Sequence, residues 1–190
     1  MSTSQAAPTP LPALRRPRLL PLVVVLVLLG GGLAARHLFG PATASPVTGT
    51  GPPAPAITAP TVDGGRFALG RQRGKVVVLY AMAAWCTACV PEAAALGRLG
   101  RTDRWQRGVA PLLVDESPRS DTPAAVQAFR ARTQGPARSW VLDQGGAIAR
   151  SYGITALDTT IVIDRAGRVA AHFNAPVDER TLRATVERLL

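Results

Sequence analysis

The pattern of apolar and polar positions predicts that strands and helices alternate from residue 61 to residue 190. Apolar runs of strand length occur at residues 76–82, 109–115, 139–142, 159–164 and 168–173, and a Gly-rich turn predicts a short hairpin at 61–67. Helical patterns cover residues 86–99, 122–133, 146–152 and 178–190. This order predicts an α/β domain, in which a mixed central sheet is covered by helices on both faces.

A different pattern marks the beginning of the chain. Residues 19–35 are mostly apolar and carry no charge, and Arg15, Arg16 and Arg18 precede them. An apolar run of this length can cross a bilayer, and basic residues before it favour a cytoplasmic N-terminus. We therefore expect a cytoplasmic tail at 1–18 and a transmembrane signal anchor at 19–36. The alternative is a cleaved signal peptide, because Ala42-Thr43-Ala44 fits a small-x-small cleavage site.

The next segment reads as a tether. Residues 40–60 are rich in proline and small side chains and carry no charge, which is typical of an extended spacer of about 3 Å per residue. The predicted organisation is therefore a linker at 37–60 followed by one folded domain at 61–190. Both interpretations of the N-terminal run place this domain outside the cytoplasm, in the periplasm or at the cell exterior, and the anchor interpretation makes membrane lipid a partner.

The charge of the chain changes this picture little. The formal net charge is +10, and Lys75 is the only lysine among the basic residues. No aromatic residues are interleaved with the arginines, and no groove-reading motif accompanies them. We therefore expect a solvated basic surface and no nucleic-acid partner.

The two cysteines carry the clearest chemical signal. They are the only cysteines in the chain and form the motif Trp85-Cys86-Thr87-Ala88-Cys89, directly after the strand predicted at 76–82. A strand that runs into a CxxC at the start of a helix is the active-site layout of a thioredoxin fold. A disulfide here closes a loop too short to stabilise the fold much, which favours reversible redox chemistry. The alternative is a zinc site, for which the chain offers only two further ligands, the distant His37 and His172.

With these residues placed, the chain resembles the membrane-anchored TlpA/ResA-like thiol-disulfide oxidoreductases, a branch of the thioredoxin superfamily. The resemblance covers about residues 52–190. Its motifs in chain order are Ala59-Pro60, Arg73-Gly74-Lys75-Val76-Val77, Trp85-Cys86, Val114-Asp115-Glu116-Ser117, Tyr152-Gly153-Ile154 and Thr159-Thr160-Ile161-Val162-Ile163-Asp164-Arg165-Ala166-Gly167.

The resemblance implies a thioredoxin-like fold with an added N-terminal hairpin, and a thiol-disulfide oxidoreductase that needs no cofactor or metal. Its implied partners are exported cysteine-containing proteins, such as apocytochrome c, and a membrane thiol reductant. A peroxidase is disfavoured because Ala83 stands where the peroxidatic threonine is expected. A copper-binding metallochaperone and a redox-silent interaction domain remain as alternatives from other functional classes.

Several residues near the cysteines are candidates for the site. Cys86 is expected to be the attacking thiol, because a helix N-terminus lowers a thiol pKa, and Cys89 the resolving thiol. Glu92 is expected either to manage protons, as the family's glutamate at this spacing does, or to lie on a solvated helix face. Trp85 is expected either to shield the sulfurs or to pack in the core. Thr159 is a candidate substrate contact.

Asp158 is the main departure from the family pattern, which has a cis-proline at this position and a proline where this chain has Ala88. A cis bond before a residue other than proline costs about 2.5–4 kcal/mol, so a trans loop is favoured here. Three interpretations of Asp158 are open: it lines the substrate face and raises the thiol pKa, it is a third metal ligand beside the cysteines, or it caps a turn and points to solvent. Tyr80 also differs, since thioredoxin has a buried aspartate there.

Overall fold

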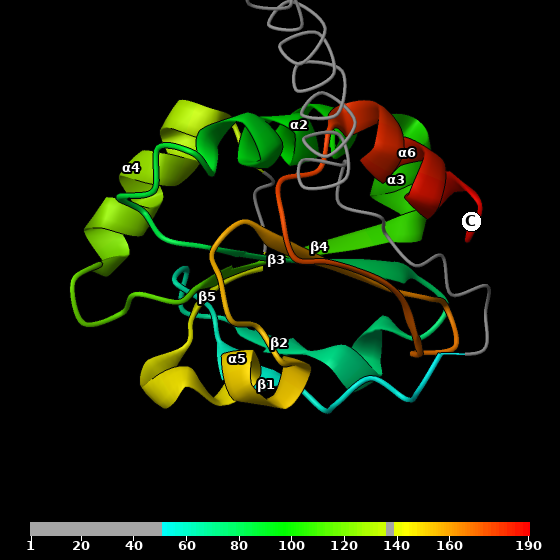
Figure 1. The fold of residues 1–190 in the computed structure, drawn as a ribbon, viewed down its shortest axis with the longest axis horizontal. Coiled ribbons are helices and arrows are strands. Elements are labelled where there is room, and N and C mark those ends of the chain that lie inside the picture. The colour runs from blue at the N-terminus through cyan, green and yellow to red at the C-terminus, as the bar shows by residue number, and fades with distance from the viewer. Residues whose placement is uncertain (1–50, 136–138) are drawn as a thin grey trace, which may run out of the picture. The chain divides into compact units, whose positions relative to one another are not determined.

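The structure, a computed structural model, describes residues 51–135 and 139–190 (Figure 1). A two-stranded antiparallel sheet contains β1 (Thr58–Pro60) and β2 (Arg66–Ala68). A five-stranded sheet has the order β5-β4-β3-β6-β7, and its strands are β3 (Val76–Met82), β4 (Val109–Asp115), β5 (Trp140–Leu142), β6 (Thr159–Ile163) and β7 (Val169–Phe173). The helices are α2 (Val90–Leu99), α3 (Asp103–Gly108), α4 (Pro123–Thr133), α5 (Ala147–Tyr152) and α6 (Glu179–Glu187), with short 3-10 turns η1 (Leu69–Gln72) and η2 (Gln144–Gly146).

Strand β3 is the centre of the main sheet and leads directly to the cysteines. It pairs in parallel with β4 and antiparallel with β6, and all of its residues are buried. Successive side chains of a strand point to opposite faces, so β3 contributes to two separate cores. Val78 and Tyr80 belong to the core under α2, α4 and α6, whereas Val77 and Leu79 belong to the core under the β1–β2 hairpin and α5. Figure 1 shows these two layers on opposite faces of the sheet.

The predicted fold class is confirmed: the sheet is mixed, and helices cover both of its faces. The strand predicted at 109–115 has those bounds in the structure, and the strands predicted at 159–164 and 168–173 are β6 and β7, which pair antiparallel. The N-cap of α4 is Thr122, whose side chain accepts a hydrogen bond from the amide of Ala125. Pro111 is tolerated in β4 because β5 pairs only with the later part of that strand, from Leu113 on.

Three local predictions differ from the structure. Helix α2 begins at Val90 and not at residue 86, because Pro91 has no N–H for an earlier helical bond and fits the first turn of a helix. Helix α3 was not predicted, since its six residues are too few to show a helical period. Residues 51–60, which the composition assigned to the spacer, pack on the domain: Ile57 and Ala59 are buried, and Tyr152 donates a hydrogen bond to the carbonyl of Pro55.

The predicted tail, signal anchor and most of the linker lie at residues 1–50, outside the described residues. Within residues 51–135 and 139–190, no helix has both the length and the apolar character needed to cross a membrane.

Candidate active site

The site is a disulfide at the end of the central strand. Cys86 and Cys89 are bonded at an S–S distance of 2.05 Å, with 5.4 Å between their Cα atoms. They lie in the turn between β3 and α2, where the amide of Cys89 donates to the Cys86 Sγ at 3.2 Å. Cys86 retains 7% of its surface exposed, whereas Cys89 is fully buried. An incoming sulfur therefore has access to Cys86 and none to Cys89.

The placement of Cys86 differs from the prediction in one respect. Because α2 begins at Val90, Cys86 precedes the helix by four residues, and Cys89 is its N-cap. Two tight turns, from the Cys89 amide to the Cys86 carbonyl and from the Val90 amide to the Thr87 carbonyl, bridge the gap. The Cys86 sulfur therefore accepts a hydrogen bond from the last amide before the helix, a contact that favours the thiolate.

Trp85 lies on the surface beside the disulfide. Its side chain is 59% exposed and is the only large hydrophobic side chain so exposed among the described residues, so the prediction of core packing is wrong. The indole Nε1 donates to the Ser117 hydroxyl at 3.1 Å, which fixes the ring against the loop after β4. An exposed aromatic ring next to the accessible sulfur is suited to contact a peptide.

Glu92 is buried in the first turn of α2, and the prediction of a solvated helix face is wrong. Its side chain is 3% exposed. The Thr160 hydroxyl donates to Oε1, and the Val177 amide donates to Oε2 at 2.8 Å. Burial raises the pKa of Glu92 to about 7, and the nearby Asp158 adds to the rise, while the two hydrogen bonds oppose it. The carboxyl group can therefore gain or lose a proton near neutral pH.

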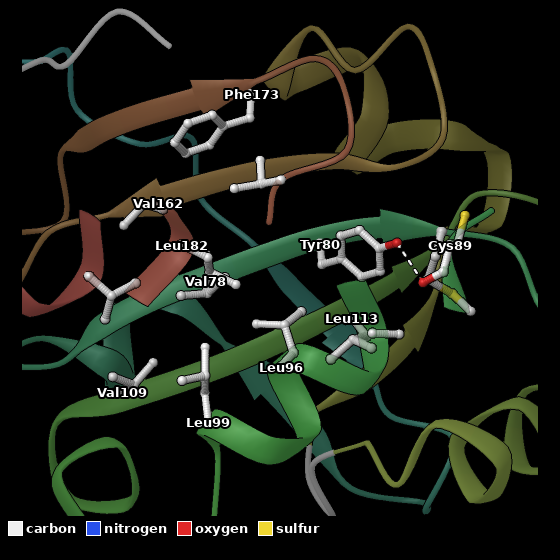
Figure 2. Packing of buried hydrophobic residues seen from close by; sticks show 14 of the residues in the cluster. Val78, Tyr80, Cys89, Leu96, Leu99, Val109, Leu113, Val162, Phe173 and Leu182 are labelled. Atoms are coloured by element: carbon white, nitrogen blue, oxygen red, sulfur yellow. Dashed lines mark hydrogen bonds between the residues drawn. The ribbon is translucent and has the colours of Figure 1, made fainter. Parts of the chain in front are cut away.

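Asp158 is also buried, and the prediction that it points to solvent is wrong. It is 5% exposed, and its Oδ1 lies 2.5 Å from the Tyr80 hydroxyl oxygen. That hydroxyl also lies 3.0 Å from the carbonyl oxygen of Cys89, a contact drawn in Figure 2. The other carboxyl oxygen of Asp158 has no hydrogen-bond partner in the part of the chain that the structure describes. Burial raises the pKa of Asp158, and the bond from Tyr80 opposes the rise.

The backbone at Asp158 adopts a left-handed conformation in place of the cis bond that a proline would allow. No peptide bond among the described residues is cis, and Asp158 has φ +64°, in the left-handed region. Asp and Asn tolerate this region better than most other residues apart from glycine. The Asp158 amide donates to the Ala81 carbonyl at 2.9 Å, which ties the loop to the end of β3. The loop therefore reaches the end of β3 and the Tyr80 hydroxyl through a trans bond.

Two other residues named in the sequence analysis, Thr159 and His172, have surroundings that indicate a role in the fold. Thr159 is fully buried, and its hydroxyl donates to the Ala156 carbonyl at 2.8 Å, so it shapes the loop before β6. His172 lies on β7, where burial lowers its pKa. Among the described residues, no group of three or more His, Cys, Asp or Glu side chains is arranged to hold a metal ion.

Sequence reasoning missed the partners of these groups. Thr160, Val177 and Ser117 hold Glu92 and Trp85 from distant parts of the chain. It also missed Asp115 and Asp121, whose carboxyl oxygens lie 3.2 Å and 2.7 Å from the amide nitrogen of Ala84. The one available signal was the position of Asp115 at the end of an apolar strand, beside the end of the strand that leads to the cysteines.

Comparisons with known proteins agree with this site. A family model described as Redoxin matches residues 50–190. The thiol:disulfide interchange protein HelX of Rhodobacter capsulatus is 28% identical over 178 residues, which are 90% of this chain and 93% of HelX. The thiol-disulfide oxidoreductase ResA of Bacillus thuringiensis is 24% identical over 176 residues, 93% of this chain and 99% of ResA. A thioredoxin-family thiol:disulfide interchange protein from Chlorobium tepidum has the same fold, with a TM-score of 0.65 at 20% identity over 75% of this chain and 98% of that one.

The raised pKa of Glu92 predicts how stability depends on pH. The folded state holds the Glu92 proton more tightly than the unfolded state, so this contribution is complete below the usual pKa of 4.5 and declines as the pH rises to about 7. The full change is on the order of 3 kcal/mol, at 1.36 kcal/mol per pKa unit. Glu92→Gln should make the free energy of unfolding less dependent on pH in this window. The measurement is urea unfolding at a series of pH values.

The matched control is Glu187→Gln, which changes an exposed glutamate on α6. It should leave the pH dependence of unfolding as it is in the wild type. Equal slopes in the wild type and Glu92→Gln would show that Glu92 is ionised throughout the window, against the prediction.

Proposed function

Because this chain belongs to the Redoxin family, we propose that it exchanges disulfides with exported proteins through Cys86 and Cys89, outside the cytoplasm and tethered to the membrane. It is a thiol-disulfide oxidoreductase of the thioredoxin superfamily, related to ResA and HelX. The observation that carries the proposed chemistry is the disulfide at the end of β3, with one sulfur accessible and the other buried.

The exchange proceeds in two steps. In the reducing direction, the Cys86 thiolate attacks one sulfur of a client disulfide, a mixed disulfide forms, and the other client sulfur leaves as a thiolate. The Cys89 thiolate then attacks the Cys86 sulfur, which releases the client and restores the protein disulfide. Two electrons pass from the protein to the client. The reverse sequence oxidises a client dithiol. The difference in exposure supports these roles, because a client reaches only Cys86.

Glu92 is the proposed proton carrier of the cycle. Cys89 must lose its proton before it attacks, and a buried thiol has no direct contact with water. A buried carboxyl group with a pKa of about 7, three residues after Cys89, can take up such a proton at neutral pH. Its hydrogen bonds to Thr160 and Val177 hold it in place whether or not it is charged.

The proposed clients are exported proteins that contain a cysteine pair, and apocytochrome c is one of them on the strength of the family resemblance. A thiol reductant in the membrane would return the protein to its dithiol form. The exposed ring of Trp85 is the proposed contact for the client chain, because it lies beside the accessible sulfur and is fixed by Ser117.

The proposed roles of the two cysteines predict opposite behaviour of two variants. Cys89→Ser should accumulate a mixed disulfide with a peptide that carries one disulfide, because the resolving step is lost. Cys86→Ser should form none, because the remaining thiol is buried. Non-reducing electrophoresis and intact mass measure both. Trapping by Cys86→Ser together with none by Cys89→Ser would reverse the assignment.

The loop at Asp158 predicts that asparagine is accepted and proline is not. Asp158→Asn keeps the left-handed backbone and removes a potential negative charge, so the Cys86 thiol should become more acidic. Asp158→Pro loses the amide bond to Ala81 and cannot adopt φ +64°, so it should destabilise the fold by more than about 1 kcal/mol. Thiolate absorbance against pH and thermal melts measure the two effects. A proline variant as stable as the wild type would mean that the loop switches to the cis form.

The tether predicts that the full-length chain stays in membranes after an alkaline wash and that external protease releases its folded part. Val24→Arg combined with Leu26→Arg interrupts the apolar run and is the control, which should be washed off. A wild-type protein that is found soluble, with its N-terminus at Ser45, would establish cleavage and contradict the anchor.

A further inference from the structure

Two buried carboxyl groups converge on the segment that leads to Cys86. Asp115 ends β4 and is 1% exposed, and Asp121 lies in the loop before α4 and is 6% exposed. The single N–H of Ala84 is directed at both, at 3.2 Å from the Asp115 Oδ2 and 2.7 Å from the Asp121 Oδ2. Because both carboxyl groups approach the same amide nitrogen, they lie close enough to interact electrostatically with each other. Two carboxylates held this close repel each other, so the arrangement favours a form in which the pair holds one proton.

The same loop holds the residues around Ala84. Asp115 accepts a bond from the Ser117 amide through its Oδ1 at 2.8 Å, and the Ser117 hydroxyl accepts the bond from the Trp85 indole. On the other side of Ala84, its carbonyl accepts a bond from Arg132 of α4 at 3.3 Å. Both the N–H and the carbonyl group of Ala84 are thus hydrogen-bonded. Asp115 is connected to Trp85 in two ways: through Ala84, the residue before Trp85, and through Ser117, which bonds to the indole.

We propose that Asp115 and Asp121 are positioning residues that, while they share one proton, clamp the Ala84 amide and thereby hold Trp85 and Cys86 in place for a client. The proposal rests on the proposed function only in taking Cys86 as the sulfur that meets the client. When the shared proton is lost, the two like charges separate. Asp121, on the loop, then moves away from the Ala84 amide, and the segment before Cys86 loses one of its hydrogen bonds.

The electrostatic surroundings favour the protonated pair. Burial and the neighbouring Asp121 raise the pKa of Asp115 above its usual value, although the bonds from the Ser117 and Ala84 amides oppose the rise. The other charged groups near the pair are Glu116, which interacts electrostatically with Asp115 and with Asp143, and Arg132, which reaches the Ala84 carbonyl. Since the folded-state pKa is raised, the clamp is complete in acid and opens as the pH rises.

The test follows the surroundings of Trp85 as the pH changes. The full-length protein, in its disulfide form so that no thiol titrates, is brought from about pH 5 to about pH 9 while tryptophan emission is recorded. Trp105 and Trp140 are buried, and a Trp85→Phe variant gives their contribution for subtraction. The wild type should show a transition in Trp85 emission. Asp121→Asn should lose it, because an asparagine amide can bond to both Ala84 and Asp115 without a titrating proton.

The chemical consequence is measured at Cys86. In a Cys89→Ser background, the rate of alkylation by iodoacetamide should show two inflections with pH, one from the thiol and one from the carboxyl pair. Asp121→Asn should retain only the thiol inflection. A purely structural role for Asp121 would change the melting temperature and leave both inflections in place, so this result would overturn the proposal.

Two further variants keep the outcome decisive. Glu116→Gln removes a neighbouring, half-buried carboxyl group. Burial raises the pKa of Glu116 to about 7, but Glu116 is not among the hydrogen-bond partners of the Ala84 amide. The Glu116→Gln variant should retain the pH transition in Trp85 emission. If this transition were lost in Glu116→Gln and retained in Asp121→Asn, the clamp would be overturned. If Asp121→Asn does not fold, Asp115→Asn makes the same test from the other side. A wild type without any Trp85 transition overturns the proposal whatever the variants do.

The emission titration needs no client and no redox partner. A protein that fails to exchange disulfides would contradict the proposed function and leave the clamp standing. A protein that traps clients but shows no transition in Trp85 emission would contradict the clamp and leave the proposed function standing.

Discussion

The hydroxyl group of Tyr80 is the contact on which the arrangement of the site depends. It connects the central strand to the first residue before α2 through the Cys89 carbonyl, and to the loop before β6 through Asp158. The hydroxyl has one hydrogen and lies within bonding distance of two acceptors. It can donate to the Asp158 carboxyl group or to the Cys89 carbonyl, so the two contacts compete for that hydrogen. Burial raises the pKa of Asp158, although the bond from Tyr80 opposes the rise, and a proton on Asp158 would let the acid donate to Tyr80 while Tyr80 donates to Cys89.

Two buried acids near the cysteine motif favour the protonated form. Glu92 follows Cys89 by three residues, and Asp158 contacts Tyr80, which contacts the Cys89 carbonyl; each acid is buried with a raised pKa. Their interaction contributes to the rise at Glu92, so ionisation of one disfavours ionisation of the other. A thiolate close to them would add a further negative charge and would disfavour their ionisation, which would link the redox state to carboxyl protonation.

The features that the sequence predicts are those that depend on residues close together in the chain. The strands β3, β4, β6 and β7 follow from apolar runs, and the cysteine pair follows from its spacing. Glu92 follows from its place one turn after Cys89. The bond between Tyr80 and Asp158 joins residues 78 positions apart, and no local pattern reports such a contact. Composition misled at residues 51–60, because a proline-rich segment can still bury Ile57 and Ala59.

Asp158 shows what changes when a covalent constraint is replaced by a polar one. A cis-proline holds a loop by its ring, and that constraint does not vary with pH. Here the loop is held by a left-handed φ of +64°, an amide bond to Ala81 and the contact between the Asp158 and Tyr80 side chains. The contact between Asp158 and Tyr80 depends on whether the buried Asp158 carboxyl group carries a proton. The segment before Cys86 is held by two further carboxyl groups, those of Asp115 and Asp121. Both segments therefore depend on hydrogen bonds to buried carboxyl groups, and such contacts, unlike a proline ring, respond to the protonation of the acid.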